Sequence, residues 1–88
     1  MTWPANAPTE ARHVFLIEMD PGADALLRVL GPFALHEATV TGLDLMPGAD
    51  RQELRVEATG LCRDLAARLG RKLEALPIVR AVGVGWRS

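Results

Sequence analysis

Length, composition and charge already exclude several classes of protein. The chain has 88 residues, 49% of them hydrophobic, which is enough for one small domain with a thin and mainly aliphatic core. Its net charge of -1 and its ten scattered basic residues argue against nucleic-acid binding, and its one cysteine cannot form an internal disulfide.

The first residues, MTWPANAPTEAR, contain two prolines and lack a cationic start followed by an apolar run. They match neither a signal peptide nor a membrane anchor. We expect residues 1–12 to form a flexible leader and residues 13–88 to form the domain. The lone cysteine fits a reducing compartment, so we expect a cytoplasmic protein without a membrane partner.

A central strand is predicted from His13 to Met19, because this segment is β-branched, aromatic and apolar on both faces. Asp20-Pro21-Gly22 ends the strand, since proline cannot donate to a ladder and glycine permits the turn.

Leucines and a valine at helical spacing predict a helix over residues 23–30. Pro32 removes one backbone hydrogen bond from any continuation of this helix, so we expect a kink there. Phe33 and Leu35 are expected to pack on the core through one last irregular turn.

Two further strands are predicted over residues 38–46 and 52–59, joined by a turn at residues 47–50 into a hairpin. Gly42 is expected to mark a bulge in the first of them. We expect Thr39, Thr41, Leu43 and Leu45 on one side of that strand and Val40 on the other. In the second, Leu54, Val56 and Ala58 alternate with charged residues.

The last two elements are a helix and a strand. Gly60 opens the helix and Pro77 ends it, and its apolar stripe consists of Leu61, Leu65, Leu69, Leu73 and Leu76. Cys62 lies inside this helix, where we expect a buried structural thiol. The final strand is predicted over residues 78–86.

The order of elements predicts an α+β ferredoxin-like βαββαβ sandwich, with a four-stranded antiparallel sheet and two helices on one face. The other face of the sheet is then bare, and the first strand is apolar on both faces. We therefore expect a homodimer.

Catalytic and metal-binding patterns are missing from the sequence. His13 and His36 have no cysteine or carboxylate partners at ligand spacing, which predicts neither a metal site nor a cofactor. Gly83-Val84-Gly85 has no helix after it, so we interpret these glycines as sites of close packing or a bulge. The only serine is Ser88, which leaves no hydrolase triad and predicts a non-catalytic protein.

The turn Asp20-Pro21-Gly22 is the most suggestive feature, because unpaired N–H groups at a helix N-terminus can hold a carboxylate or phosphate. Many such turns hold nothing.

Residues 13–86 resemble the ACT regulatory domains, and most of all the short small (regulatory) subunit of acetohydroxyacid synthase (acetolactate synthase). The family run Gly-Ala-Leu-x-Arg-Val-x-Gly-x-Phe is similar to LLRVLGPF at residues 26–33, which Ala38-Thr39-Val40 follows. The similarity continues through residues 54–84. The resemblance implies a regulatory dimer in branched-chain amino acid biosynthesis, attached to a large catalytic subunit.

In this family, an amino-acid effector binds between two domains, near the loop that joins the first strand to the first helix. The resemblance implies effector-binding residues in that loop and at the start of the second strand: Asp20, Pro21, Gly22, Ala23, Asp24, Ala25, Thr39 and Val40. Thr39 stands where the family has an asparagine that helps hold the effector, so we expect weaker binding than is usual for the family.

Two other functions remain open from the residues. A small ferredoxin-like enzyme of the dimeric α/β-barrel kind needs only a histidine and an apolar pocket, whereas an acylphosphatase is nearly excluded because the only asparagine is Asn6. The other alternative is an assembly or chaperone module of the same fold that binds protein but no amino acid.

Overall fold

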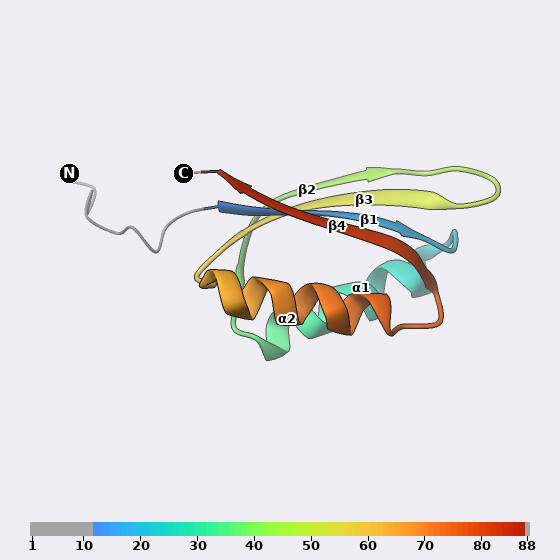
Figure 1. The fold of residues 1–88 in the computed structure, drawn as a ribbon. Helices are drawn as coiled ribbons and strands as arrows, with labels where there is room; N and C mark the ends of the chain where they lie inside the picture. Colours follow the sequence, from blue (N-terminus) through green and yellow to red (C-terminus); the bar gives the residue numbers. More distant parts are fainter. Residues whose placement is uncertain (1–11, 88) are drawn as a thin grey trace.

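The structure, a computed structural model, describes residues 12–87 (Figure 1). In chain order its elements are β1 (Arg12–Met19), α1 (Ala23–Leu35), β2 (Thr39–Met46), β3 (Gln52–Thr59), α2 (Arg63–Glu74) and β4 (Val79–Arg87). The predicted order of strands and helices is confirmed. The expected leader lies outside the described residues, apart from Arg12, which already belongs to β1.

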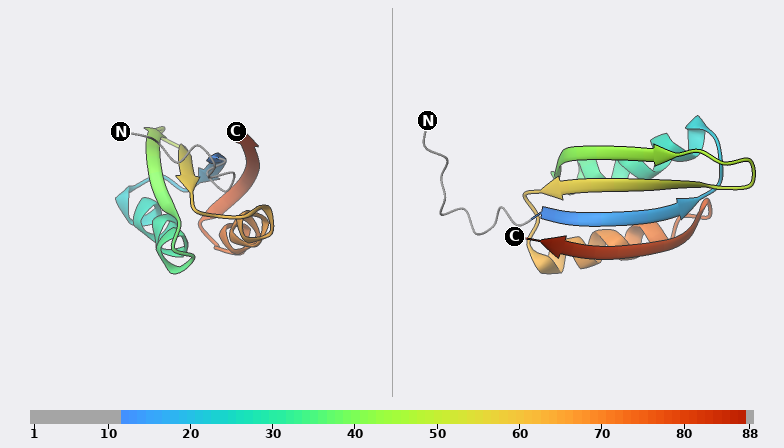
Figure 2. Two further views of the ribbon diagram at one scale, coloured as in Figure 1. Left: turned by 90° about the vertical axis from the view of Figure 1, so that its left-hand side faces the viewer. Right: turned by 90° about the horizontal axis from the view of Figure 1, so that it is seen from above.

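The four strands form one antiparallel sheet in the order β2-β3-β1-β4, and both helices lie on the same face of it (Figure 2). The predicted ferredoxin-like α+β fold is therefore confirmed. β1 is central because it is paired on both sides, as its apolar sequence indicates. Neither helix in the described part of the chain is long and apolar enough to cross a membrane.

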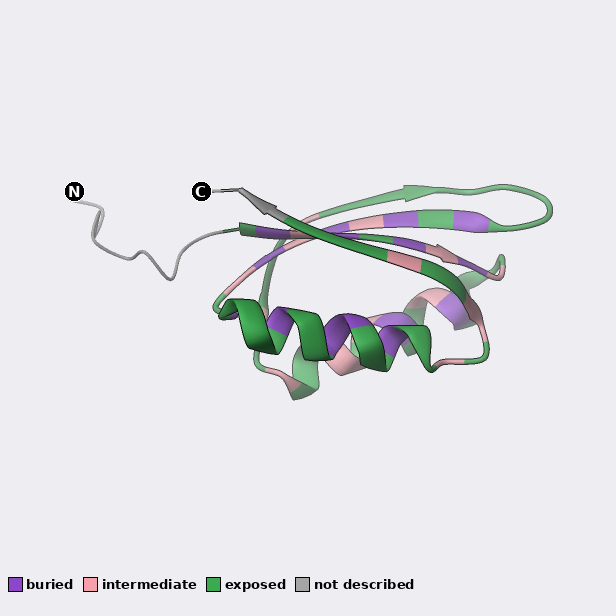
Figure 3. Cartoon of the chain, viewed as in Figure 1, coloured by how far each residue is buried: buried purple, intermediate pink, exposed green. Residues whose placement is uncertain are grey.

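The core lies between the sheet and the helices (Figure 3). Alternate residues of β1 and β3 point into it, as period-two strands require. The Phe15 ring of β1 meets the Phe33 ring of α1 edge to face, with ring centroids 5.0 Å apart. The remaining core side chains are mainly aliphatic: Ile17, Met19, Ala25, Val29, Leu54, Val56, Ala58, Leu61, Ala66, Leu69 and Leu73.

The first helix runs further than the sequence suggests. α1 includes Pro32 and continues to Leu35, and the N–H of His36 bonds to the Pro32 carbonyl. Phe33 is buried as expected, but Leu35 is 79% exposed, so the prediction that it packs on the core is wrong. The reason is that α1 stays helical, and about 100° per residue carries Leu35 far around the helix from Phe33.

The bulge expected at Gly42 is present, since the register of β2 against β3 shifts between Val40 and Gly42. Its consequence was not foreseen. The extra residue places Val40 opposite Ala58 and Leu43 opposite Val56, so both share the side of β2 that faces the helices. The expectation that Thr39 lies on that side with Leu43 is wrong.

Cys62 is the N-cap residue of α2 and is exposed, so the prediction of a buried thiol inside the helix is wrong. The chain turns at Gly60, which has a φ of +86°, and Leu61 enters the core before the helix begins. Gly83 and Gly85 are not sites of close packing within the chain either, because a Cβ atom at either would meet nothing within 4 Å.

Candidate functional site

Gln52, the first residue of β3, holds the loop between β1 and α1 in place. The Gln52 side chain is buried and its Nε2 donates to the carbonyl oxygens of Asp20, at 3.0 Å, and Gly22, at 2.8 Å. This buried amide supplies a donor to the Asp20 carbonyl and a second donor to the Gly22 carbonyl, which also accepts the Leu26 N–H at 3.5 Å. The sequence alone did not single out this residue, because its partners lie about thirty positions away.

Arg80 of β4 also contacts this loop. Its Nε and Nη2 donate to Asp20 Oδ1 at 3.2 and 3.1 Å, and its Nη2 also donates to the Asp50 carbonyl at 3.0 Å. The loop after β1 is thereby tied to the turn between β2 and β3. Arg80 and Asp20 are both partly exposed, so this link orients the loop more than it stabilises the fold.

The N-terminus of α1 has no side-chain cap. Gly22 is its N-cap, with φ +109° and ψ 157°, and no side chain within residues 12–87 caps the first-turn N–H groups. Asp24, in that first turn, pairs instead with Arg28 at 3.1 Å. The start of α1 therefore presents backbone donors at the positive end of a helix dipole.

The expected site residues fall into two groups. Asp20 to Ala25 lie together at the end of β1 and the start of α1. Thr39 and Val40 begin β2, which runs parallel to β1 because both are antiparallel to β3, so they lie at the opposite end of the sheet. Eight residues of strand separate the groups by roughly 25 Å, and one chain does not bring them together.

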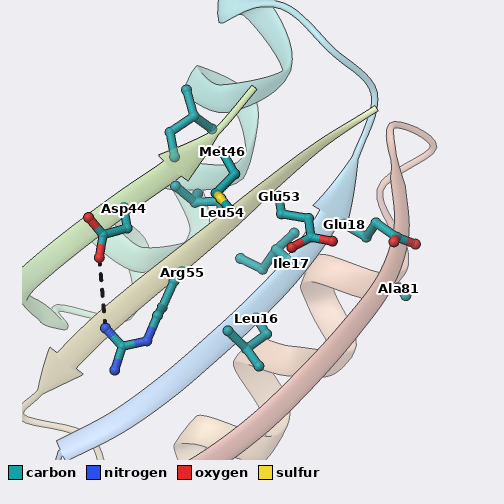
Figure 4. A pocket seen from close by; sticks show the side chains of 10 residues that line it. Leu16, Ile17, Glu18, Asp44, Met46, Glu53, Leu54, Arg55 and Ala81 are labelled. Atoms are coloured by element: carbon teal, nitrogen blue, oxygen red, sulfur yellow. Dashed lines mark ion pairs between the residues drawn. The ribbon is translucent and has the colours of Figure 1, made fainter. Parts of the chain in front are cut away.

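A cleft of about 730 Å³ lies over the opposite, uncovered face of the sheet (Figure 4). Glu18 of β1 faces Glu53 of β3 directly across the strand pair. Arg51 pairs with Glu18 at 3.2 Å, and Arg55 approaches Asp44 at 4.0 Å. The other residues that line the cleft are apolar: Leu16, Ile17, Leu45, Met46, Leu54 and Ala81. The sequence did not indicate this cleft.

Neither histidine lines this cleft. His13 is buried on the helix side of β1, with no hydrogen-bond partner for its Nδ1, and burial together with the nearby Arg63 lowers its pKa. His36 caps the end of α1, where its Nδ1 lies 3.0 Å from the Pro32 carbonyl oxygen and donates to it. Within residues 12–87 no three His, Cys, Asp or Glu side chains gather closely enough to hold a metal ion.

Comparison with family models and with curated proteins finds no match. Several solved structures resemble the chain, among them the following two. The C-terminal domain of the MgtC protein from Mycobacterium tuberculosis has a TM-score of 0.72 at 20% identity, over 90% of this chain and 89% of that one. The ACT domain from GTP pyrophosphokinase of Chlorobium tepidum has a TM-score of 0.76 at 13% identity, over 88% and 100%. The chain therefore has the fold of an ACT domain.

Proposed function

We propose that this chain is a non-catalytic regulatory domain of the ACT type, which acts as a homodimer and binds a small amino acid. The observation that carries the proposal is the start of α1. It offers uncapped backbone donors on a loop that Gln52 and Arg80 hold in place. The ACT-type fold is consistent with this role.

The chemistry of the loop suits a zwitterion. First-turn N–H groups of α1 bind the α-carboxylate of the effector. Asp20 carries a carboxylate of which Arg80 contacts only Oδ1, and its other oxygen is available to an ammonium group. A phosphate is less suitable, because Asp20 and Asp24 would repel it. The loop chemistry thus favours an amino acid, and the family resemblance implies that it is valine, leucine or isoleucine.

The edge strand β2 is the surface through which the homodimer forms. Among the described residues, six of the nine exposed large hydrophobic side chains lie on α1 or β2, including Leu27, Val40, Leu43 and Leu45. β2 pairs only with β3, and Asp44 is its single charge. An edge with so little protection is suited to pairing with another strand.

Antiparallel pairing of β2 with β2 of a second copy also completes the effector site. Such pairing aligns the start of one β2 with the end of the other. Thr39 and Val40 of the second copy then lie at the end of the sheet that holds Asp20 to Ala25. The two groups of expected residues, separated within one chain, meet across this interface.

We further propose that the dimer attaches to a large catalytic subunit of a biosynthetic enzyme such as acetohydroxyacid synthase. The support for this step is the sequence resemblance over residues 13–86. Co-purification from the native host, read by mass spectrometry, tests it. A thiamine-dependent large subunit in the complex is the expected result, and its absence contradicts this part of the proposal.

Effector binding is tested by isothermal titration with valine, leucine and isoleucine. Gly22→Val should abolish the heat, because a β-branched side chain fits poorly at φ +109° and the loop must shift away from the geometry that presents the first-turn donors. Gly31→Ala is the matched control, since a Cβ there meets nothing within 4 Å and lies away from the loop. Circular dichroism checks that both variants fold. No heat with the parent at millimolar ligand contradicts effector binding.

The dimer is tested separately by light scattering. Leu43→Lys places a charge on the free edge of β2 and should halve the particle mass, whereas Leu65→Lys, a similarly exposed leucine on α2, should leave it unchanged. An unchanged mass in Leu43→Lys overturns the edge interface.

A further inference from the structure

The outward residues of β1 carry charge in a definite order on the face of the sheet opposite the helices, here called the open face (Figure 2). Arg12 stands at one end, Val14 and Leu16 follow, and Glu18 stands at the other end. Leu16, in the middle, is 56% exposed. The strand is thus basic at its start, apolar in its centre and acidic at its end.

The neighbouring strand β3 shows a related order. Arg55 lies beside Leu16 and Glu57 lies beside Val14 in the register of the two strands, while Glu53 lies beside Glu18. On β4 the residues that face outward beside Leu16 and Val14 are Gly83 and Gly85. At the centre of the open face, β1 therefore presents apolar side chains, β3 presents charged side chains, and β4 presents glycines, which have no side chain.

We propose that the open face packs against the open face of a second copy, across a two-fold axis that runs perpendicular to the strands. This interface is distinct from the β2 edge and does not depend on effector binding. Since an edge-paired dimer has two open faces, both on one side of its sheet, the full assembly contains four chains.

Charge complementarity selects this arrangement. The axis reverses the order of residues along each strand, so Glu18 lies over Arg12 of the second copy and Leu16 lies over its Val14. On β3 the same operation places Arg55 over Glu57 of the second copy, so the Arg55–Glu57 pair that each chain already forms at 3.1 Å lies over the same pair of its partner in reversed order. Each contact occurs twice because the interface is symmetric. The open face is complementary to itself in this orientation.

The alternative orientation is unfavourable. An axis parallel to the strands would place residues at one level along the strands over residues at the same level of the second copy. Glu18 and Glu53 already lie opposite each other in one sheet, so four carboxylates would gather at one end of the interface. Like charges that face one another directly are destabilising.

The shape of the face permits close approach. A Cβ atom at Gly83 or Gly85 would meet nothing within 4 Å, so the backbone of β4 is bare where the two sheets meet. Packed sheets lie about 10 Å apart and are rotated by about 30°, which displaces Glu18 from Arg12 by roughly one strand spacing. An arginine side chain spans that displacement.

The area of the contact is small. Four strands of about eight residues offer on the order of 500 Å² per copy, or about 1,000 Å² in total, at strand spacings of about 4.8 Å and rises of about 3.3 Å. This value is at the lower limit for a specific interface. Association through the open face is therefore expected to depend on concentration.

Sedimentation equilibrium of the full chain tests the proposal with a charge swap. Glu18→Arg alone and Arg12→Glu alone each create two like-charge contacts and should weaken association through the open face at least about tenfold. The double variant, with both changes in one chain, restores both contacts with reversed polarity and should regain parental association. Glu74→Arg, an equal charge change on α2, should have no effect.

Three results would overturn the proposal: a parent mass that does not rise with concentration beyond the edge-paired dimer, single variants that associate like the parent, or a double variant that associates no better than the singles. The edge interface is tested independently by Leu43→Lys, so failure of one interface does not imply failure of the other.

A variant that fails to fold would not end the test. The intrachain pairs of Glu18 with Arg51 and of Arg12 with Glu57 are partly exposed and contribute little to stability. Gly83→Leu provides a second route, because its side chain enters empty space in one chain but blocks the approach of a second copy. Parental association of a folded Gly83→Leu protein also overturns the proposal.

Discussion

Gln52 and Gly22 are joined by a hydrogen bond of 2.8 Å from Nε2 to the carbonyl oxygen, so the first residue of β3 fixes the residue on which α1 begins. The same amide donates to Asp20. Gln52 is one of two buried polar residues in the described part of the chain, and its Nε2 has partners, whereas Nδ1 of the other, His13, has none. The candidate effector loop is therefore positioned by the core of the domain.

Gln52→Leu should destabilise the domain by roughly 1 to 3 kcal/mol, because the Asp20 carbonyl loses its Gln52 donor and the Gly22 carbonyl keeps only the long bond from the Leu26 N–H. Urea unfolding measures the loss. Glu53→Gln, at the next position but exposed, should change the stability by less than about 0.5 kcal/mol. Equal stability of the Gln52→Leu variant and the parent would mean that the bridge contributes nothing to the loop.

Phe33→Ala should destabilise the domain by about 3 to 5 kcal/mol, as expected for the loss of a buried aromatic side chain. Leu35→Ala should have little effect on the monomer, because Leu35 is 79% exposed. Thermal unfolding of both variants checks whether α1 stays helical past Pro32. A large loss for Leu35→Ala would support the irregular turn that the sequence suggested.

The fold was predictable because hydrophobic periodicity survives in most of the elements. β3 has the clearest alternation, and its predicted and observed limits coincide at residues 52–59. The length of α1 was underestimated. Pro32 removes only one backbone hydrogen bond, and the burial of Phe33 in the core outweighs that loss.

The candidate site was less predictable, since it depends on contacts between distant residues. Asp20 to Ala25 could be singled out from local turn chemistry. Gln52 and Arg80 could not, because each reaches the loop only after the sheet has formed. The bulge at Gly42 was expected, but the resulting change of side at Val40 needs the observed register.

Gly83→Ala should stabilise the isolated chain by roughly 0.5 to 1 kcal/mol, because glycine in a strand loses more conformational entropy on folding than alanine does and the new methyl group meets nothing. Gly60→Ala is the contrasting control. Gly60 has a φ of +86°, so the same substitution there should destabilise the fold. Urea midpoints at low protein concentration measure both, and a destabilised Gly83→Ala chain would contradict the open environment of Gly83.

His13 should make the stability fall as the solution becomes acidic. Its side chain is buried, its Nδ1 has no partner, and desolvation, with a further contribution from the Arg63 charge, lowers its pKa below the ordinary value of 6.5. The folded state therefore binds a proton less readily than the unfolded state. Between the lowered pKa and 6.5 the unfolded chain carries more protons, so the free energy of unfolding rises with pH through this window. The contribution is complete above about pH 6.5 and is lost as the pH falls toward the folded-state pKa.

Urea unfolding of the parent and of His13→Leu at a series of pH values from about 7.5 to about 5 measures this dependence. The parent should lose stability across the series, and His13→Leu should lose less, because leucine cannot take up a proton and suits the buried position. If His13→Leu follows the parent at every pH, the acid sensitivity of the domain does not arise from His13, and His13 is not the group that must stay neutral for the chain to fold.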